Sequence, residues 1–438
     1  MRTLIMTRLL TAAGAACVLA LGACEIDESL SVDPNAPSIN SVAENATETQ
    51  LNLLVSGLEA DIRQGYAQYV TATGSVAREL YLFDADPRNT ADLLNGNIDN
   101  NTFYLTAPYN NAYGVVKTAN ILLDAVDNTA NVTEAEKQGY RGVANTFKAL
   151  ALQRVADMLG SNGIRVDVAD PENLGPFLSE PDALAAIETI YQSGFDQLQG
   201  ADFAFSLSSG FEGFDDPASF ATFNRALAAR TTLQRRDSSA TLDNIDDSYF
   251  VAGEMPDLGP EYIFSTASGD FLNPLYRIPG NTGNMIFATP SWFNEAEDGD
   301  QRLATLVEPR VDTFVRDTLF GIYETRKFAS ATSPIEILPN VELHLMRAEA
   351  LAQTDELEDA VELINIVRSL AGLDPFDSDD QDEVVDQVLR ERRYSLWQTG
   401  NRFADLRRYG RLNADFVTVD RPGDRVASEF PIPLSEGL

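Results

Sequence analysis

The sequence predicts a mostly α-helical protein built from stacked helix pairs, with a large insertion of loops and short strands. Apolar residues recur at helical spacing over most of 47–235 and again over 336–438. Between these parts, residues 236–335 mix proline, glycine, asparagine and aromatic residues with little periodicity. We therefore expect a single domain over 47–438, with an N-terminal helical part, an irregular insertion and a C-terminal helical part.

The N-terminal part begins with a predicted helix over 47–72. Its apolar stripe is formed by Leu51, Leu54, Val55, Leu58 and Ile62. Residues 82–112 are predicted as a long loop, because asparagine, aromatic, proline and glycine residues break any period. Further helices are predicted over 109–126, 134–159, 181–199 and 217–235. Thr133 and Glu136 have the spacing of a capping box, and Pro217 suits a first helical turn.

The C-terminal part has the most regular pattern. Three helices are predicted over 339–353, 356–371 and 381–399. Asp355 separates the first helix from the second, and Gly372 ends the second as a C-cap. These two helices form a pair close in length to a tetratricopeptide unit, with small alanines where helices approach closely. The earlier helix pairs are looser candidates for the same unit, so the predicted fold resembles stacked tetratricopeptide repeats.

The first residues have the pattern of a bacterial lipoprotein signal peptide. Arg2 and Arg8 give a basic start, and the short apolar stretch 9–21 leads to small residues directly before Cys24. In such signals the cysteine becomes the acylated N-terminus. We therefore expect 1–23 to be removed and Cys24 to carry lipid that holds the protein at the outer membrane. The alternative is a signal peptide whose cleavage site merely lies near a cysteine.

Charge excludes one class of partner. The sequence has 67 acidic and 32 basic residues, with a net charge of −35, so it repels nucleic acid and anionic headgroups. Residues 24–46 are predicted as an acidic, extended leader, which is either a surface-targeting signal or a solvated spacer. Beyond the signal there is no run of about 18 apolar residues, so we expect no membrane-spanning helix.

Candidate catalytic and metal-binding groups are scarce. His344 is the single histidine, it falls on a predicted helix, and no Gly-x-Ser-x-Gly motif accompanies it. One histidine and one lipidated cysteine cannot supply a zinc site. Oxygen ligands at 243–247 and 377–380 make structural calcium possible, but neither stretch matches a glycine-containing calcium loop. We therefore expect no enzyme activity and no cofactor.

Several motifs resemble one known family in their order and spacing. They lie at 341–350, 364–373, 389–396, 400–408 and 430–433, and include Arg390-Glu391-Arg392-Arg393-Tyr394, Gly400-Asn401-Arg402-Phe403 and Phe430-Pro431-Ile432-Pro433. Together with the lipoprotein signal, they resemble the SusD/RagB family of outer-membrane nutrient-binding lipoproteins.

The resemblance implies a cell-surface protein that captures a nutrient, usually a glycan. It also implies a partner, a TonB-dependent outer-membrane barrel of the SusC type, which this protein would cover as a lid. A peptide or another oligomer stays open as the ligand. Two other classes stay open for the protein: a helical-repeat scaffold lipoprotein for outer-membrane assembly, and, with less support, a surface glycoside hydrolase.

Charged residues of the C-terminal motifs are predicted to form partly buried ion pairs. They are Glu349, Glu391, Arg392, Arg393, Asp405 and Arg407. Buried arginine and glutamate need partners whatever the function, so a structural network is expected. A pocket for an anion is the alternative.

Two segments combine aromatic and polar residues in the way a sugar site requires, with ring faces for C–H groups and polar partners for hydroxyls. The residues expected to contact ligand are Arg78, Tyr81, Phe83, Asn101, Phe103, Tyr104, Tyr276 and Trp292, with Asn100, Arg277, Asn281, Asn284 and Phe293 beside them. Trp292 is the best aromatic candidate, because Trp397 falls on a structural helix. Core packing is the alternative for each of them.

Overall fold

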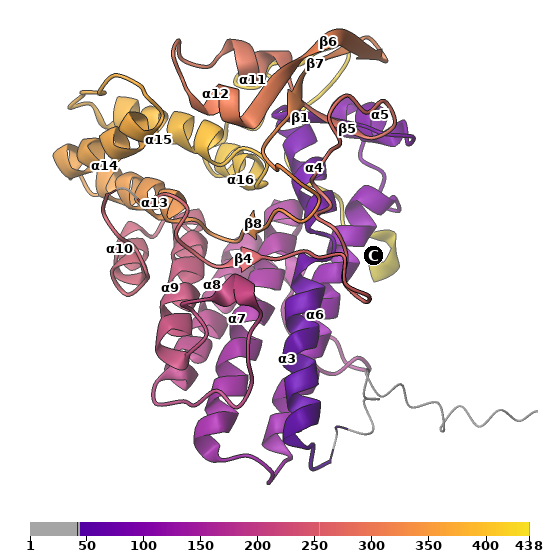
Figure 1. Ribbon diagram of the computed structural model, residues 1–438, viewed down its shortest axis with the longest axis vertical. Helices are drawn as coiled ribbons and strands as arrows, with labels where there is room; N and C mark the ends of the chain where they lie inside the picture. Colours follow the sequence, from indigo (N-terminus) through magenta and orange to yellow (C-terminus); the bar gives the residue numbers. More distant parts are fainter. Residues whose placement is uncertain (1–41, 43, 254, 438) are drawn as a thin grey trace, which may run out of the picture.

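The protein is represented by a computed structural model that describes residues 42, 44–253 and 255–437 (Figure 1). The predicted signal peptide, Cys24 and all but the end of the predicted leader lie outside the described residues. No helix in the described part of the chain combines the length and the apolar character needed to cross a membrane.

The N-terminal part is a layered stack of helices. It contains α3 (Glu48–Arg63), α4 (Tyr66–Val76), α5 (Arg88–Asn95), α6 (Phe103–Asp127), α7 (Glu134–Leu159), α8 (Glu180–Leu198) and α9 (Pro217–Gln234). Helix α6 packs on α7, α7 on α8, and α8 on α9, so consecutive helices are neighbours in space (Figure 1). The predicted stack of helix pairs is confirmed here.

Local signals set the ends of these helices. The Thr133 side chain accepts from the backbone N–H of Glu136, whose carboxylate accepts from the Thr133 N–H at 2.6 Å, so the predicted capping box closes the start of α7. Asp216 caps α9, and Pro217 occupies its first position, where no N–H partner is lost. The helices predicted over 134–159, 181–199 and 217–235 are therefore confirmed to within a residue.

The predicted single helix over 47–72 is broken into α3 and α4 at Gly65. This residue has φ +69°, and a Cβ there would lie 2.5 Å from Nδ2 of Asn111 in α6. The glycine therefore both allows the break and lets the chain approach α6.

The predicted loop over 82–112 is wrong. Strand β1 (Leu80–Phe83), α5 and the first turns of α6 occupy it instead. Helix α6 contains Pro108, which removes one helical hydrogen bond, but Leu105 and Tyr109 beside it are buried, and this burial offsets the loss. Tyr104 and Tyr109, which seemed to break the pattern, belong to the buried face of α6.

The described residues of the insertion contain strands, as predicted, together with three helices that the loss of periodicity did not indicate. Its elements are α10 (Ser238–Asp246), β4 (Glu261–Tyr262), β5 (Met285–Ala288), α11 (Pro290–Asn294), α12 (Arg302–Leu306), β6 (Val307–Arg316), β7 (Leu319–Thr325) and β8 (Ile335–Glu336). Four strands form an antiparallel sheet in the order β1-β5-β7-β6, at the top of Figure 1. Strand β4 pairs with β8, and β2 (Ile164–Arg165) pairs with β3 (Phe177–Leu178).

The C-terminal part contains α13 (Asn340–Gln353), α14 (Leu357–Leu370), α15 (Gln381–Ser395) and α16 (Asn401–Arg408). Asp355 has φ +68° between α13 and α14, and Gly372 has φ +72° after α14, as their predicted breaking roles require. Leu373 N–H donates to Arg368 O at 2.9 Å and closes the helix end. The third predicted helix ends at Ser395, four residues early, and α16 was not foreseen.

Candidate functional site

The charged residues of the C-terminal motifs form the predicted ion pairs. Both terminal nitrogens of Arg408 reach the two carboxylate oxygens of Glu349, and Arg392 Nε lies 2.8 Å from Asp405 Oδ2. Burial by itself would raise the pKa of Asp405, but Arg392 and Arg408 lower it to about 2. These contacts join α13, α15 and α16, which makes them structural.

Other members of this set pair with residues that the sequence analysis did not name. Glu391 binds Arg302 at 2.7 Å and Arg368 at 3.0 Å. Arg393 binds Glu79 at 2.9 Å and so connects α15 to the residue that directly precedes β1. The remaining pair is Arg407 with Glu180, at 2.9 Å.

His344 is a buried structural residue. Its Nδ1 lies 2.9 Å from Asn340 O, and its Nε2 accepts from the N–H of Gly253 at 3.3 Å. Burial lowers its pKa, so the ring stays neutral near pH 7. Among the described residues, no group of three or more His, Cys, Asp or Glu side chains is arranged to hold a metal ion.

The two segments predicted to form a ligand site do lie side by side. Strand β1 pairs antiparallel with β5, with Tyr81 opposite Phe287. Just beyond the strands, the Thr289 hydroxyl donates to Arg78 O at 2.7 Å. Residues separated by about two hundred positions therefore meet, as the sequence suggested, but through a sheet.

Five of the predicted contact residues are in the protein core. The exposed fraction is 1% for Arg78, Tyr81 and Tyr104, and 0% for Phe83 and Trp292. Tyr81 stacks on Phe83 with ring centres 5.5 Å apart. The structure gives these side chains packing roles, and they present no free ring face to a sugar. The sequence could not distinguish the two cases, because a buried strand with alternating aromatic residues has the same composition as a binding loop.

Trp292, the best aromatic candidate for ligand contact in the sequence, is a packing residue in the structure. Its ring packs 5.0 Å from the ring of Trp397 and 5.2 Å from that of Tyr394. It joins α11 to α15 and to the turn that follows α15.

The other predicted residues lie nearer the surface. Asn101 is exposed, and Phe103 is half-buried under the guanidinium of Arg88, 5.2 Å from the ring centre. Tyr276 is half-buried. Burial lowers the pKa of Arg277 to about 10, opposed by Asp84 of the other segment.

Four further residues were expected beside these. Asn100 is half-buried and Asn284 exposed, and the Asn281 carbonyl accepts from Arg310 at 3.0 Å. Phe293 lies flat on Tyr323, with ring centres 3.5 Å apart. One face of the Phe293 ring is therefore covered by Tyr323, so this part of the surface offers polar groups more than ring platforms.

A better-formed hollow lies between α3, the segment 206–211 and β4. It encloses about 270 Å³. Its lining includes Ser56, Glu59, Arg63, Ser206, Ser208, Phe211, Glu261 and Asp270. We call it the α3–β4 pocket.

Arg63 organises one wall of the α3–β4 pocket. Its Nη2 lies 2.9 Å from Asp270 Oδ1, and its guanidinium lies over the rings of Phe271 and Phe264, at 4.8 Å and 5.7 Å. It also donates to Ile263 O. These contacts fix the loop after β4 against the C-terminal end of α3.

Glu59 forms a second wall. It accepts from the Ser208 N–H at 3.0 Å. Burial raises its pKa, opposed by Ser208 and by Arg63. Carboxylates, serine hydroxyls and the half-buried Leu207 and Ile263 side chains thus surround one space, which offers polar partners for sugar hydroxyls and apolar surface for C–H groups. Sequence reasoning missed it because its residues come from three distant segments with no shared motif.

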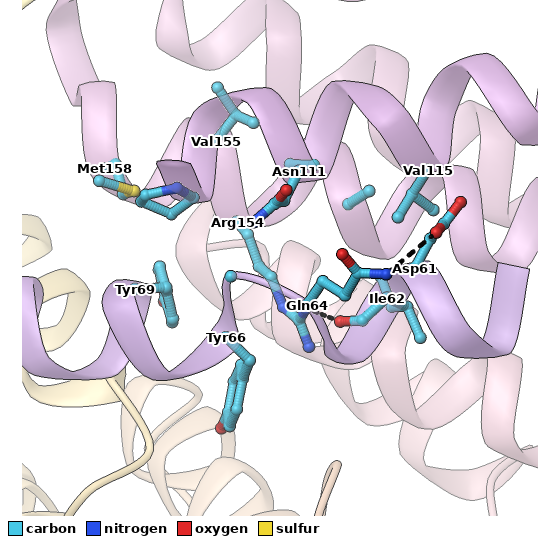
Figure 2. A pocket seen from close by; sticks show the side chains of 14 residues that line it. Asp61, Ile62, Gln64, Tyr66, Tyr69, Asn111, Val115, Arg154, Val155 and Met158 are labelled. Carbon is cyan, nitrogen blue, oxygen red and sulfur yellow. Dashed lines mark hydrogen bonds between the residues drawn. The ribbon is translucent and has the colours of Figure 1, made fainter. Parts of the chain in front are cut away.

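A second hollow lies at the α3–α4 break and is shown in Figure 2. Arg154 of α7 donates to Ile62 O at 2.6 Å, and its guanidinium lies 4.7 Å from the ring centre of Tyr66. The space is only about 10 Å³, which is room for about one water. It is therefore a packed junction and no site for a sugar.

Residues 340–430, which contain α13 to α16 and their ion pairs, match the SusD family model. This C-terminal segment is therefore similar to the SusD family. No curated protein matches the sequence closely enough to count as a relative.

The whole chain shares its fold with solved structures of low sequence identity. A SusD superfamily protein from Bacteroides vulgatus is 13% identical, with a TM-score of 0.71 over 89% of this chain and 96% of that one. Surface glycan-binding protein A from Bacteroides thetaiotaomicron, solved with laminarihexaose, is 16% identical, with a TM-score of 0.70 over 89% and 97%. A laminarin-binding SusD-like protein is 16% identical, with a TM-score of 0.68 over 90% and 97%. The predicted fold class is confirmed.

Proposed function

We propose that this protein is a cell-surface lipoprotein of the SusD type that binds oligosaccharides and does not alter them. The observation that carries the proposal is the likeness, over 89% of the chain, to a surface glycan-binding protein solved with a bound glucan. The family match over 340–430 supports the same class. A glucan related to laminarihexaose is the first ligand to test.

The α3–β4 pocket is the proposed saccharide site. Its volume of about 270 Å³ suits one or a few ring units of a longer chain that extends into solvent. Glu59 and Glu261 accept hydrogen bonds there, and the half-buried Leu207 and Ile263 side chains supply apolar surface. A helical-repeat scaffold would need no such hollow, which favours a receptor over the scaffold class.

The finer part of the proposal concerns the partner. The lipid at Cys24 tethers the protein beside a TonB-dependent barrel, which it covers as a lid over captured saccharide. The tether makes each new encounter effectively intramolecular, so even a weak contact with the barrel is sufficient. The family resemblance supports this arrangement.

Saccharide binding is tested by calorimetry of the purified lipoprotein with laminarihexaose and a panel of neutral oligosaccharides. Binding is expected, and mass spectrometry is expected to recover each oligosaccharide at its original length. Shortened products would support the hydrolase class instead. Failure to bind any saccharide would refute the proposal.

The location is tested by filling the pocket. Ser56 is exposed and lines the pocket, so Ser56→Trp blocks it without disturbing the core. We expect affinity to fall about tenfold or more, or ~1.4 kcal/mol. Ser239→Trp, at an exposed position of α10, is the matched control and should bind normally. Equal affinities would place the saccharide elsewhere.

The partner is tested separately. Solubilised outer membranes should yield the lipoprotein together with a barrel transporter, and proteases added to intact cells should cleave the lipoprotein. Recovery without any barrel would argue against the lid, and protection from protease would support the scaffold class.

A further inference from the structure

A groove lined by arginine side chains lies between α15, α16 and the segment after α11. It has a volume of about 570 Å³ and shares no lining residue with the α3–β4 pocket. Its four arginines are Arg390, Arg393, Arg402 and Arg411. We call it the arginine groove. A cluster of four cationic side chains contrasts with the net charge of −35 of the whole chain.

The acidic residues of the arginine groove are already engaged. Glu295 lies 2.6 Å from Arg393, and Asp386 lies 2.5 Å from Arg411. The third, Glu383, accepts from a serine hydroxyl at 2.7 Å. Two of the four arginines are therefore neutralised within the groove itself.

Arg390 and Arg402 are not neutralised in this way. Within the described residues, Arg390 makes no ion pair, and its recorded partner is the main-chain oxygen of Glu295 at 2.7 Å. Arg402 lies 4.0 Å from Glu79 and donates to Leu389 O at 3.2 Å, but its Nε is buried without a hydrogen-bond partner. Burial lowers the pKa of Arg402 and Glu79 opposes this, so an added anion would stabilise the guanidinium.

We propose that the arginine groove binds the anionic group, a carboxylate or a sulfate ester, of an acidic saccharide. The planar forks of Arg390 and Arg402 match such a group, because guanidinium can hold two oxygens at once. Phe376 also lines the groove and is half-buried, so it offers an apolar face to a sugar ring. The volume falls within the range of about 300–1,000 Å³ found for small-ligand clefts.

This inference rests on the proposed saccharide binding and adds a second, charge-selective site to it. The acidic surface repels a long polyanion, but screening over about 8 Å at physiological salt leaves a short acidic oligomer free to enter. Neutral saccharides gain nothing from the two arginines, so the groove selects on charge.

The test uses calorimetry of the whole lipoprotein with trigalacturonate, a sulfated disaccharide and laminarihexaose. Arg390→Glu removes an exposed cation that supports no ion pair among the described residues. Arg235→Glu, outside the groove, makes the same change in net charge. We expect Arg390→Glu to lower the affinity for the acidic probes by about tenfold or more, because charge-assisted hydrogen bonds are lost. Arg235→Glu should change the affinity for the acidic probes by less than about threefold. Neither substitution should change the affinity for laminarihexaose.

Binding of either acidic probe with this dependence supports the inference, and the stronger probe identifies the anionic group. If laminarihexaose binds and neither acidic probe does, the inference fails while the proposed function stands. If no saccharide binds, both fail. Equal affinity of Arg390→Glu and the parent for the acidic probes, or tighter binding of a polyglutamate peptide than of trigalacturonate, would also overturn it.

Discussion

Glu261 and Glu336 face each other directly across the β4–β8 strand pair. Burial raises the pKa of both, and Asp257 raises each further, while Lys327 opposes the rise at Glu336. Like charges opposite each other destabilise a sheet, so this pair is held together by the surrounding fold.

Replacing Glu261 with Gln is therefore expected to stabilise the protein. A carboxyl whose folded pKa is raised costs stability as pH increases from its unfolded pKa through its folded pKa, and that cost persists at higher pH. We expect Glu261→Gln to increase the free energy of unfolding by about 0.5 kcal/mol at pH 7. The gain should disappear near pH 4, where both carboxyls are protonated. Urea unfolding at the two pH values measures it, and an equal gain at both would contradict this explanation.

Gly65 gives a second prediction. With φ +69° and no room for a Cβ beside Asn111, Gly65→Ala should lower the free energy of unfolding by about 2 kcal/mol or more. Gly114 in α6 has no atom near its ideal Cβ position, so Gly114→Ala should raise it by about 0.5–1 kcal/mol. Denaturant unfolding of both variants tests the contrast. A loss at Gly65 no larger than the change at Gly114 would show that the break tolerates a side chain.

The sequence predicted the fold where local signals and periodicity agree. Thr133 and Glu136 marked the start of α7, Pro217 that of α9, and Asp355 the separation of α13 from α14. Each of these residues sets the conformation of the backbone within a few residues of itself, so its effect could be predicted without knowledge of the tertiary structure. Residues 82–112 failed because their regularity depends on tertiary burial of aromatic side chains.

The candidate site was less predictable than the fold. The sequence indicated that the segments at 78–104 and 276–293 lie close together, and β1 and β5 do pair. It could not separate a buried aromatic strand from a binding loop, since both use the same residues. The α3–β4 pocket brings together Glu59, Ser206 and Glu261, whose separation in sequence leaves no pattern to read.

Asp405 gives a third prediction, because its folded pKa of about 2 lies below the usual value. A depressed carboxyl pKa contributes stability that is present above the unfolded pKa and is lost as pH falls through the folded pKa. Asp405→Asn leaves Arg392 and Arg408 buried with one partner fewer, so we expect a loss of about 3 kcal/mol at pH 7.

The difference between Asp405→Asn and the parent should shrink between about pH 4 and pH 2, which unfolding curves across that range would show. Asp415→Asn, at an exposed position, is the control and should change little at any pH. A difference that stays constant down to pH 2 would mean that the loss comes from packing alone.

Trp292 provides the last prediction, and it separates stability from binding. Its ring is fully buried against Trp397 and Tyr394, so Trp292→Ala should lower the free energy of unfolding by about 3–5 kcal/mol. Trp292→Phe keeps most of the packing and should fold. Because the ring does not line the α3–β4 pocket, Trp292→Phe should bind laminarihexaose within about threefold of the parent, if that glucan is a ligand. Calorimetry of the folded variant measures this. A large loss of affinity with intact folding would return Trp292 to the binding site that its sequence context first suggested.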